Sequence, residues 1–278
     1  MAKTIVAITG ASSGIGAAFA RRLAAGHDLL LIARRKERLD RLRDELSRAY
    51  GTNAETIQAD LSSDKDMEAV AQRIENEARL SLLINNAGFG TKGRFWEASL
   101  EGQEQMHRLH VMATVRLTHA ALRNMVPRDF GGIINVASIA AFVRSPGTAS
   151  YSATKSWMTS FTEGLYLELK TVRSNVAVQA LCPGFTYSEF HEVVGTTREQ
   201  MMSNSKFWMP AEAVVEASLE GLGRRKLIVV PGWRYQLLTG LVTKLPTRAR
   251  LAFESAGARF RQQRLSLPTR RSGEISGE

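Results

Sequence analysis

Short apolar runs alternate along this chain with longer amphipathic segments, and this alternation restricts the possible folds more than any other feature. Apolar and β-branched runs predict strands at residues 3–9, 28–33, 55–59, 81–85, 132–137, 175–182 and 227–230. Helical periodicity predicts helices at residues 15–25, 36–50, 64–78, 100–125, 150–172 and 211–222. Such an order implies right-handed crossovers and a parallel sheet covered by helices on both faces. We therefore expect a single-domain α/β fold with a doubly wound sheet.

A glycine-rich turn, Thr9-Gly10-Ala11-Ser12-Ser13-Gly14-Ile15-Gly16, joins the first predicted strand to the first predicted helix. Its first two glycines allow a tight turn and close approach of the backbone to a ligand, and the third lets the helix lie near the sheet. Free N–H groups and the positive end of the helix attract a pyrophosphate. The turn therefore predicts a nucleotide site made by Gly10, Ser12, Ser13, Gly14, Ile15 and Gly16.

Arg34 and Arg35 follow the second predicted strand, where an NAD site usually has an acidic residue for the ribose 2′-hydroxyl. Arginine pairs with a 2′-phosphate, whereas a carboxylate repels it, so these residues predict NADP(H), with Arg34 first and Arg35 second. The alternative is a pair of solvated arginines at the start of a basic helix. Asp60 and Leu61 follow the third strand, where Asp60 suits either the adenine amino group or a helix N-cap.

The formal net charge is +10, and residues 231–278 contribute +6 from nine Lys or Arg and three Glu. A basic tail can bind nucleic acid or an anionic membrane. We favour a solvated, partly disordered end and expect no nucleic-acid partner. No apolar run approaches the ~18–20 residues of a membrane span, and the start lacks the pattern of a secretion signal, so we expect a cytoplasmic protein. Cys182, the single cysteine, is expected to be a buried thiol at a strand end, and no metal site is predicted.

Further motifs follow later predicted strands at regular places. They are Asn85-Asn86-Ala87-Gly88, Ser138, Tyr151-x-x-x-Lys155 and Pro183-Gly184. With the glycine turn and Asp60, they make the chain resemble the short-chain dehydrogenase/reductase family over residues 3–232. The resemblance implies a Rossmann fold, a nicotinamide cofactor, a Ser-Tyr-Lys site, and assembly into homodimers or homotetramers.

The same resemblance implies roles for individual residues. Lys155 also holds the nicotinamide ribose, and Asn86, Ala87 and Gly88 form the wall beside the cofactor. Backbone and hydroxyl groups reach the carboxamide from Pro183, Gly184, Thr186 and Ser188, with Ser188 where a threonine is usual. We expect residues 1–232 to form the NADP(H)-binding catalytic domain, with residues 185–210 as a substrate flap.

The chemistry of the Tyr-Lys pair also follows from its spacing. Tyr151 and Lys155 lie four residues apart on one predicted helix, so they share a face. A tyrosine has a pKa near ~10, and a nearby ammonium and an oxidised nicotinamide are expected to lower it toward the working pH. Ser138 ends the fifth strand and can donate to a carbonyl oxygen that gains negative charge.

His110 departs from the family pattern, because an asparagine usually completes a catalytic tetrad at this position. In the family that residue acts largely through its backbone carbonyl, which binds a water that contacts the lysine. We favour this backbone role for His110. A proton relay through its ring, or a packing substitution, are the alternatives.

The substrate flap is rich in methionine and aromatic residues: Phe190, Val193, Val194, Met201, Met202, Phe207, Trp208 and Met209. Such a segment suits an apolar, lipid-like carbonyl compound, or simply packs over the cofactor. The leading hypothesis is a carbonyl reductase or alcohol dehydrogenase. The alternative is a catalytically silent NADP(H)-sensing regulator, which would not need Ser138, Tyr151 and Lys155 together.

Residues 233–278 form a basic, partly amphipathic extension. Its apolar positions Trp233, Tyr235, Leu237, Leu238, Leu241, Val242 and Leu245 are interspersed with Lys and Arg. We favour packing on the chain itself or on a second subunit, and peripheral membrane contact is the alternative.

Overall fold

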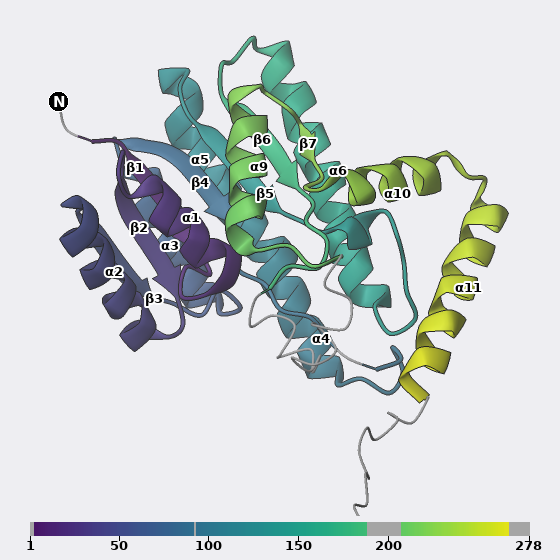
Figure 1. Cartoon of the computed structure of the whole chain (residues 1–278). Helices are drawn as coiled ribbons and strands as arrows, with labels where there is room; N and C mark the ends of the chain where they lie inside the picture. The colour runs from purple at the N-terminus through teal and green to yellow at the C-terminus, as the bar shows by residue number, and fades with distance from the viewer. Residues whose placement is uncertain (1–2, 92, 188–206, 267–278) are drawn as a thin grey trace, which may run out of the picture.

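The computed structural model describes residues 3–91, 93–187 and 207–266, with only the backbone for residues 257–266. One parallel sheet has the order β3-β2-β1-β4-β5-β6-β7 (Figure 1). Its strands are β1 (Ile5–Thr9), β2 (Asp28–Ala33), β3 (Ala54–Gln58), β4 (Leu80–Asn85), β5 (Gly132–Val136), β6 (Ala177–Leu181) and β7 (Ile228–Val229). The chain reverses its direction of winding between β1 and β4, as in a Rossmann fold. The predicted fold class is confirmed.

Helices cover both faces of this sheet (Figure 1). One face carries α1 (Gly14–Leu23), α2 (Lys36–Tyr50) and α9 (Ala211–Gly223), and the other carries α3 (Asp64–Glu75), α5 (Ala113–Arg128) and α6 (Ala149–Thr171). The apolar faces of these helices pack against strands that are buried on both sides; β1 is buried along its whole length. This two-sided burial explains why central strands such as β1 and β2 read as continuous apolar runs, whereas the edge strand β3, in which Glu55 and Gln58 are exposed, does not.

The long helical stretch predicted over residues 100–125 is confirmed, but it is not a uniform α-helix. The chain instead forms α4 (Leu100–His107), a five-residue π-helical turn η1 (Arg108–Met112), and then α5. A π turn contains an extra residue compared with an α turn, and such turns often mark functional positions. Here it contains His110, which is fully buried.

Two helices follow β7 in the C-terminal extension. They are α10 (Trp233–Lys244), beside the edge of the sheet, and α11 (Thr247–Ser266), which runs along the side of the molecule (Figure 1). Within the described ranges, no helix combines the length and the hydropathy needed to cross a membrane. The predicted end of the tail, residues 267–278, lies outside the described residues.

Candidate active site

The glycine turn lies between β1 and α1 and requires its glycines. Gly10 and Gly14 have positive φ angles of 65° and 54°, which favour glycine. A Cβ on Gly16 would lie 2.3 Å from the carbonyl oxygen of Gly10, so only glycine fits there. The result is an open cradle of backbone N–H groups at the start of α1, which fits the pyrophosphate of a dinucleotide.

Thr9 and Asn86 join the ends of β1 and β4 at the point where the sheet reverses. The Thr9 hydroxyl accepts hydrogen bonds from the backbone N–H groups of Asn86 (2.9 Å) and Ala87 (3.0 Å). The Asn86 side-chain amide donates to the carbonyl oxygens of Thr9 (2.9 Å) and Gly10 (3.3 Å). These bonds hold residues 86–87, part of the predicted wall beside the cofactor, against the glycine turn. This role of Thr9 was not predicted from the sequence.

Arg35, rather than Arg34, lies over the glycine turn. Its guanidinium donates to the hydroxyl of Ser12 (3.0 Å) and to that of Ser13 (2.8 Å). The structure therefore brings Arg35 together with Ser12 and Ser13, two residues of the predicted nucleotide site. The predicted order of the two arginines toward a 2′-phosphate stays a prediction, since these hydrogen bonds lie within the chain itself.

Arg34 lies instead with Asp60 in a separate hollow that is also lined by Gln58, Ala59 and Asp66. Burial acts to raise the pKa of Asp60, but hydrogen bonds from Ser62 and the charge of Arg34 lower it overall. The Asp60 carboxylate accepts from the backbone N–H and hydroxyl of Ser62, in the manner of a residue that caps a turn.

Two apolar residues of the predicted cofactor set have side chains that pack in or against the core. The side chain of Leu61 is buried in the core, and that of Ile15 packs against the core on the opposite face of the sheet. Neither side chain faces a ligand site.

Ser138, Tyr151 and Lys155 converge beyond the carboxyl end of β5. Ser138 directly precedes the short 3-10 helix η2 (Ile139–Ala141), and its hydroxyl accepts from the N–H of Ala140 at 3.1 Å. It also hydrogen-bonds to the Tyr151 phenol. The Lys155 ammonium lies 5.8 Å from the centre of the Tyr151 ring and donates to the carbonyl oxygen of Val136 at 2.9 Å. The structure therefore brings the three predicted residues, Ser138, Tyr151 and Lys155, together in space.

Burial sets the protonation of this cluster. Desolvation raises the pKa of Tyr151 to about 12, although the hydrogen bond from Ser138 acts to lower it. Desolvation also lowers the pKa of Lys155 to about 8. We predicted that the lysine would lower the pKa of the tyrosine, but burial has the larger effect among the chain's own groups. At neutral pH the phenol is protonated and can act as an acid.

His110 connects two sides of the cluster through its ring. Nε2 accepts from the backbone N–H of Phe89 at 3.2 Å, and Nδ1 lies 2.9 Å from the Thr154 hydroxyl. That hydroxyl donates to the carbonyl oxygen of Tyr151 at 2.8 Å, so the network assigns the proton to Nδ1. A Cβ on Gly88 would lie 2.7 Å from Nε2, so the ring also requires this glycine. Phe89 and Thr154 were not predicted from the sequence, because nothing in their residue types marks them.

This environment keeps the His110 ring neutral. Burial is the largest cause of a pKa well below the usual 6.5, and the charge of Lys155 adds to it. Both ring nitrogens are also occupied by hydrogen bonds. The geometry therefore disfavours a proton relay through the ring and favours a role in positioning.

A neutral buried histidine predicts that acid destabilises the protein. The unfolded state binds a proton on His110 below pH ~6.5 whereas the folded state does not, so the free energy of unfolding should fall by up to about 1.4 kcal/mol per pH unit. Urea unfolding at pH 7.5 and 5.5 measures this loss. The loss of stability between these two pH values should be smaller in His110→Gln. It should persist in His119→Gln, which replaces an exposed histidine of α5. An equal loss in all three proteins would contradict the prediction.

Pro183 and Gly184 follow β6 and lie next to Ser138. The carbonyl oxygen of Pro183 accepts from the N–H of Ile139 at 3.0 Å. The Thr186 hydroxyl donates to the Gly184 carbonyl at 3.1 Å. Ser188 lies outside the described residues, as do the flap positions 190, 193, 194, 201 and 202.

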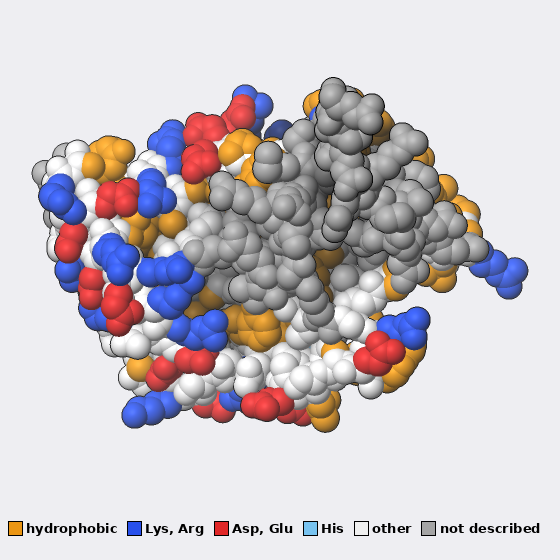
Figure 2. Space-filling model, turned by 60° about the horizontal axis from the view of Figure 1, so that its bottom comes forward, with side chains coloured by type: hydrophobic (Ala, Val, Ile, Leu, Met, Phe, Trp, Pro, Cys, Tyr) orange, Lys and Arg blue, Asp and Glu red, His pale blue; other side chains and the backbone are white. Residues whose placement is uncertain are grey.

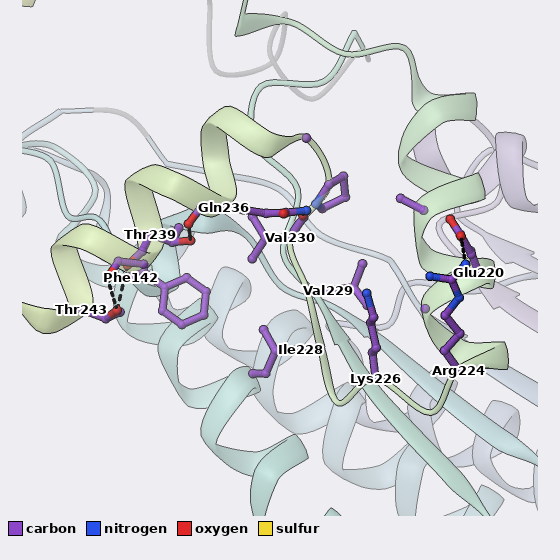
Figure 3. Close-up of a pocket in the computed structure, with 15 residues that line it drawn as sticks. Phe142, Glu220, Arg224, Lys226, Ile228, Val229, Val230, Gln236, Thr239 and Thr243 are labelled. Carbon is purple, nitrogen blue, oxygen red and sulfur yellow. Dashed lines mark hydrogen bonds and ion pairs between the residues drawn. The ribbon is translucent and has the colours of Figure 1, made fainter.

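The molecular surface at the carboxyl ends of the strands is partly charged and partly apolar. Seen from this side, a group of Lys and Arg side chains lies beside a hydrophobic patch (Figure 2). A different pocket, of about 510 Å³, is lined by residues of α9, β7 and α10 (Figure 3). It does not include Ser138, Tyr151 or Lys155 among its lining residues, so it is not the candidate active site.

Comparison with known proteins agrees with this geometry. Residues 4–199 match the family model described as short chain dehydrogenase. The chain is a short chain dehydrogenase. As a member of this oxidoreductase family, it is an enzyme with an NAD(P)(H)-binding Rossmann fold.

Three solved structures of short chain dehydrogenases and related enzymes cover nearly the whole chain. A short-chain dehydrogenase from Sphingobium yanoikuyae in complex with NADPH is 34% identical, with a TM-score of 0.77 and coverage of 98% of this chain and 99% of that one. A bulky-bulky ketone specific alcohol dehydrogenase from Comamonas testosteroni is 29% identical, with a TM-score of 0.74 and coverage of 99% and 98%. A family member from Burkholderia phymatum in complex with NAD is 25% identical, with a TM-score of 0.73 and coverage of 99% and 98%.

Proposed function

We propose that this short chain dehydrogenase reduces an apolar ketone with NADPH, and that Tyr151 is the proton donor. The observation that carries the proposal is the convergence of Ser138, Tyr151 and Lys155 at the end of β5, with a phenol that burial keeps protonated. A protonated phenol is the form needed for reduction, because the new alcohol takes its proton from an acid.

Each residue of the cluster has a distinct task. Ser138 donates a hydrogen bond to the substrate carbonyl oxygen, which gains negative charge as the carbon is reduced. The nicotinamide, when bound, supplies the hydride that reaches this carbon. Tyr151 transfers its phenolic proton to the oxygen, and the charge of Lys155 stabilises the phenolate that remains. His110 takes part by positioning: it holds Phe89 and, through Thr154, the first turn of α6.

The choice of NADPH rests on Arg35 and Arg34. Arg35 and the two serines form a group of donors at the exposed rim of the glycine turn. No acidic residue replaces either arginine at the end of β2. Among similar structures, the one from S. yanoikuyae binds NADPH and the one from B. phymatum binds NAD, so the comparisons support either cofactor.

Cofactor preference is directly measurable. We expect NADPH to bind about ten- to a hundredfold more tightly than NADH, since charged hydrogen bonds to a 2′-phosphate contribute about 1.5–3 kcal/mol. Arg35→Ala should remove most of this difference without weakening NADH binding. Arg41→Ala, which removes an exposed charge elsewhere on α2, is the matched control. Equal affinity for the two cofactors in the unmodified protein would contradict the NADPH assignment.

The substrate class rests on aromatic side chains beyond β6. Phe185 and Tyr187 are partly exposed. The ring of Phe185 stacks on that of Trp208 and the ring of Tyr187 is tilted against it, each at a ring-centre distance of 5.3 Å. Such a surface suits a ketone with bulky apolar groups. The C. testosteroni enzyme, by its description, is specific for bulky-bulky ketones.

A panel of ketones tests the function. NADPH oxidation, followed at its absorbance band, should be fastest with ketones that carry two large apolar groups. The alternative of a silent NADP(H) sensor predicts cofactor binding without turnover on any member of the panel.

We also propose that the protein is cytoplasmic and forms homo-oligomers. The outer face of α10 supports association, because Trp233, Leu237 and Leu241 recur at helical spacing and are 67%, 66% and 54% exposed. Among the residues that the structure describes, these three side chains are therefore only partly covered. A second subunit remains the favoured partner for this face.

A further inference from the structure

Two chain segments beyond β6 are joined to each other. These wall segments are residues 184–187, which follow β6, and residues 207–209, which precede α9. The N–H of Tyr187 donates to the Met209 carbonyl at 3.0 Å, and the N–H of Met209 donates to the Phe185 carbonyl at 2.9 Å. Thr186 and Met209 accordingly form an isolated parallel bridge. The aromatic surface described above, Phe185, Tyr187 and Trp208, is carried by these two segments.

A side chain from the C-terminal extension connects the same two segments a second time. The Tyr235 hydroxyl, from α10, accepts from the N–H of Phe185 at 3.1 Å and donates to the carbonyl oxygen of Phe207 at 2.5 Å. Tyr235 is only 5% exposed. Burial raises the pKa of its phenol, so the hydroxyl keeps the proton that it donates.

The ring of Tyr235 fits against a glycine. A Cβ on Gly184 would lie 2.2 Å from the ring, so no other residue at position 184 allows this packing. Gly184 follows Pro183, whose carbonyl oxygen holds the residue after Ser138. The ring of Tyr235 is therefore linked to the candidate catalytic cluster through Gly184, Pro183 and Ile139.

The helix that carries Tyr235 has its own attachment to the sheet. Gln236 donates from its side chain to the carbonyl oxygen of Val230 at 2.9 Å, and Figure 3 shows it extending from α10 toward this part of the chain. The extension also contacts the loop between η2 and α6. There the buried carboxylate of Glu254, from α11, accepts from the N–H of Arg144 at 2.9 Å, in the loop between Ser138 and Tyr151.

We propose that Tyr235 is a positioning residue of the substrate site, which holds the aromatic wall segments at the spacing that a bulky apolar ketone requires. The proposal rests on the proposed function, whose substrate class it deepens. It assigns a part of the substrate site to the C-terminal extension, which lies outside the region that matches the family model.

The substitution Tyr235→Phe tests this role, because it removes only the hydroxyl and keeps the ring against Gly184. In hydrogen–deuterium exchange, the N–H of Phe185 loses its acceptor, so we expect at least about tenfold faster exchange in peptides that contain this residue. In kinetics with bulky ketones, KM should rise about tenfold with kcat nearly unchanged, as expected when substrate binding alone is weakened. For a small ketone such as 2-butanone, KM should change less than about twofold.

Tyr50→Phe is the matched control, since Tyr50 is an exposed tyrosine at the end of α2. It should match the unmodified protein in both measurements. Unchanged exchange at Phe185, or an equal loss with bulky and small ketones, would overturn the proposal. If the unmodified protein reduced no ketone, the proposed function would fail instead, and the exchange measurement would still decide whether Tyr235 holds the wall segments.

Discussion

Tyr151→Phe is expected to lower kcat for ketone reduction by about 10²–10⁴-fold, the range typical for loss of a general acid. The substitution removes the proposed proton donor and leaves the ring, which makes an edge contact with His110 at a ring-centre distance of 5.8 Å. The glycine turn and Arg35 are untouched, so NADPH should bind nearly as tightly as before. Single-turnover reduction and an NADPH titration measure the two effects separately.

The matched control for this prediction is Tyr166→Phe, which changes an exposed tyrosine farther along the same helix. It should keep the kcat of the unmodified protein. Substantial turnover by Tyr151→Phe on a good substrate would show that the proton comes from another group. A silent sensor, in contrast, would show no turnover in any of these proteins.

Lys155→Met is expected to lower kcat/KM by about 10²-fold or more, because it removes the charge that stabilises the phenolate. It also replaces a buried ammonium, whose desolvation opposes folding, by an apolar side chain and leaves the Val136 carbonyl without its partner at 2.9 Å; because the two effects oppose each other, the free energy of unfolding should change little. NADPH affinity should fall as well, if Lys155 holds the nicotinamide ribose as the family resemblance implies. This combined loss distinguishes Lys155→Met from Tyr151→Phe.

The pH dependence of the unmodified protein gives a second test of Lys155. Its pKa of about 8 means that the ammonium is charged below this pH and loses its proton above it. We therefore expect kcat/KM for reduction to fall above pH ~8, since this parameter reports groups of the free enzyme. In Lys155→Arg the charge persists at all accessible pH values, so this fall should disappear even if overall activity is lower. A fall at the same pH in both proteins would assign it to another group.

Local sequence was sufficient for the fold and for the shared helix face of Tyr151 and Lys155. Strands that are buried on both faces must be apolar along their length, so β1 and β2 could be read directly, and β2 begins and ends where predicted. The glycine turn is determined by the positive φ angles at Gly10 and Gly14, which other residues rarely adopt. Tyr151 and Lys155 share a face because four residues make about one helical turn.

Other features depended on contacts between residues far apart in the sequence. The π turn around His110 interrupts a segment whose periodicity favours a continuous helix, and the ring's partners Phe89 and Thr154 come from other parts of the chain. Sequence pattern could not show which of Arg34 and Arg35 reaches the hydroxyls of Ser12 and Ser13, because this contact depends on how the ends of β1 and β2 lie side by side in the sheet.

The sequence by itself thus determined the sheet and the glycine turn, since each of these follows from backbone conformation or burial pattern within a few residues, and the resemblance to the family supplied the Ser-Tyr-Lys set. Only the tertiary structure decided the protonation of Tyr151, whose pKa depends on how completely folding removes water from its hydroxyl. It alone also decided the contact of Tyr235 with Phe185, fifty residues away. Burial and long-range hydrogen bonds are properties of the packed chain, so no local pattern encodes them.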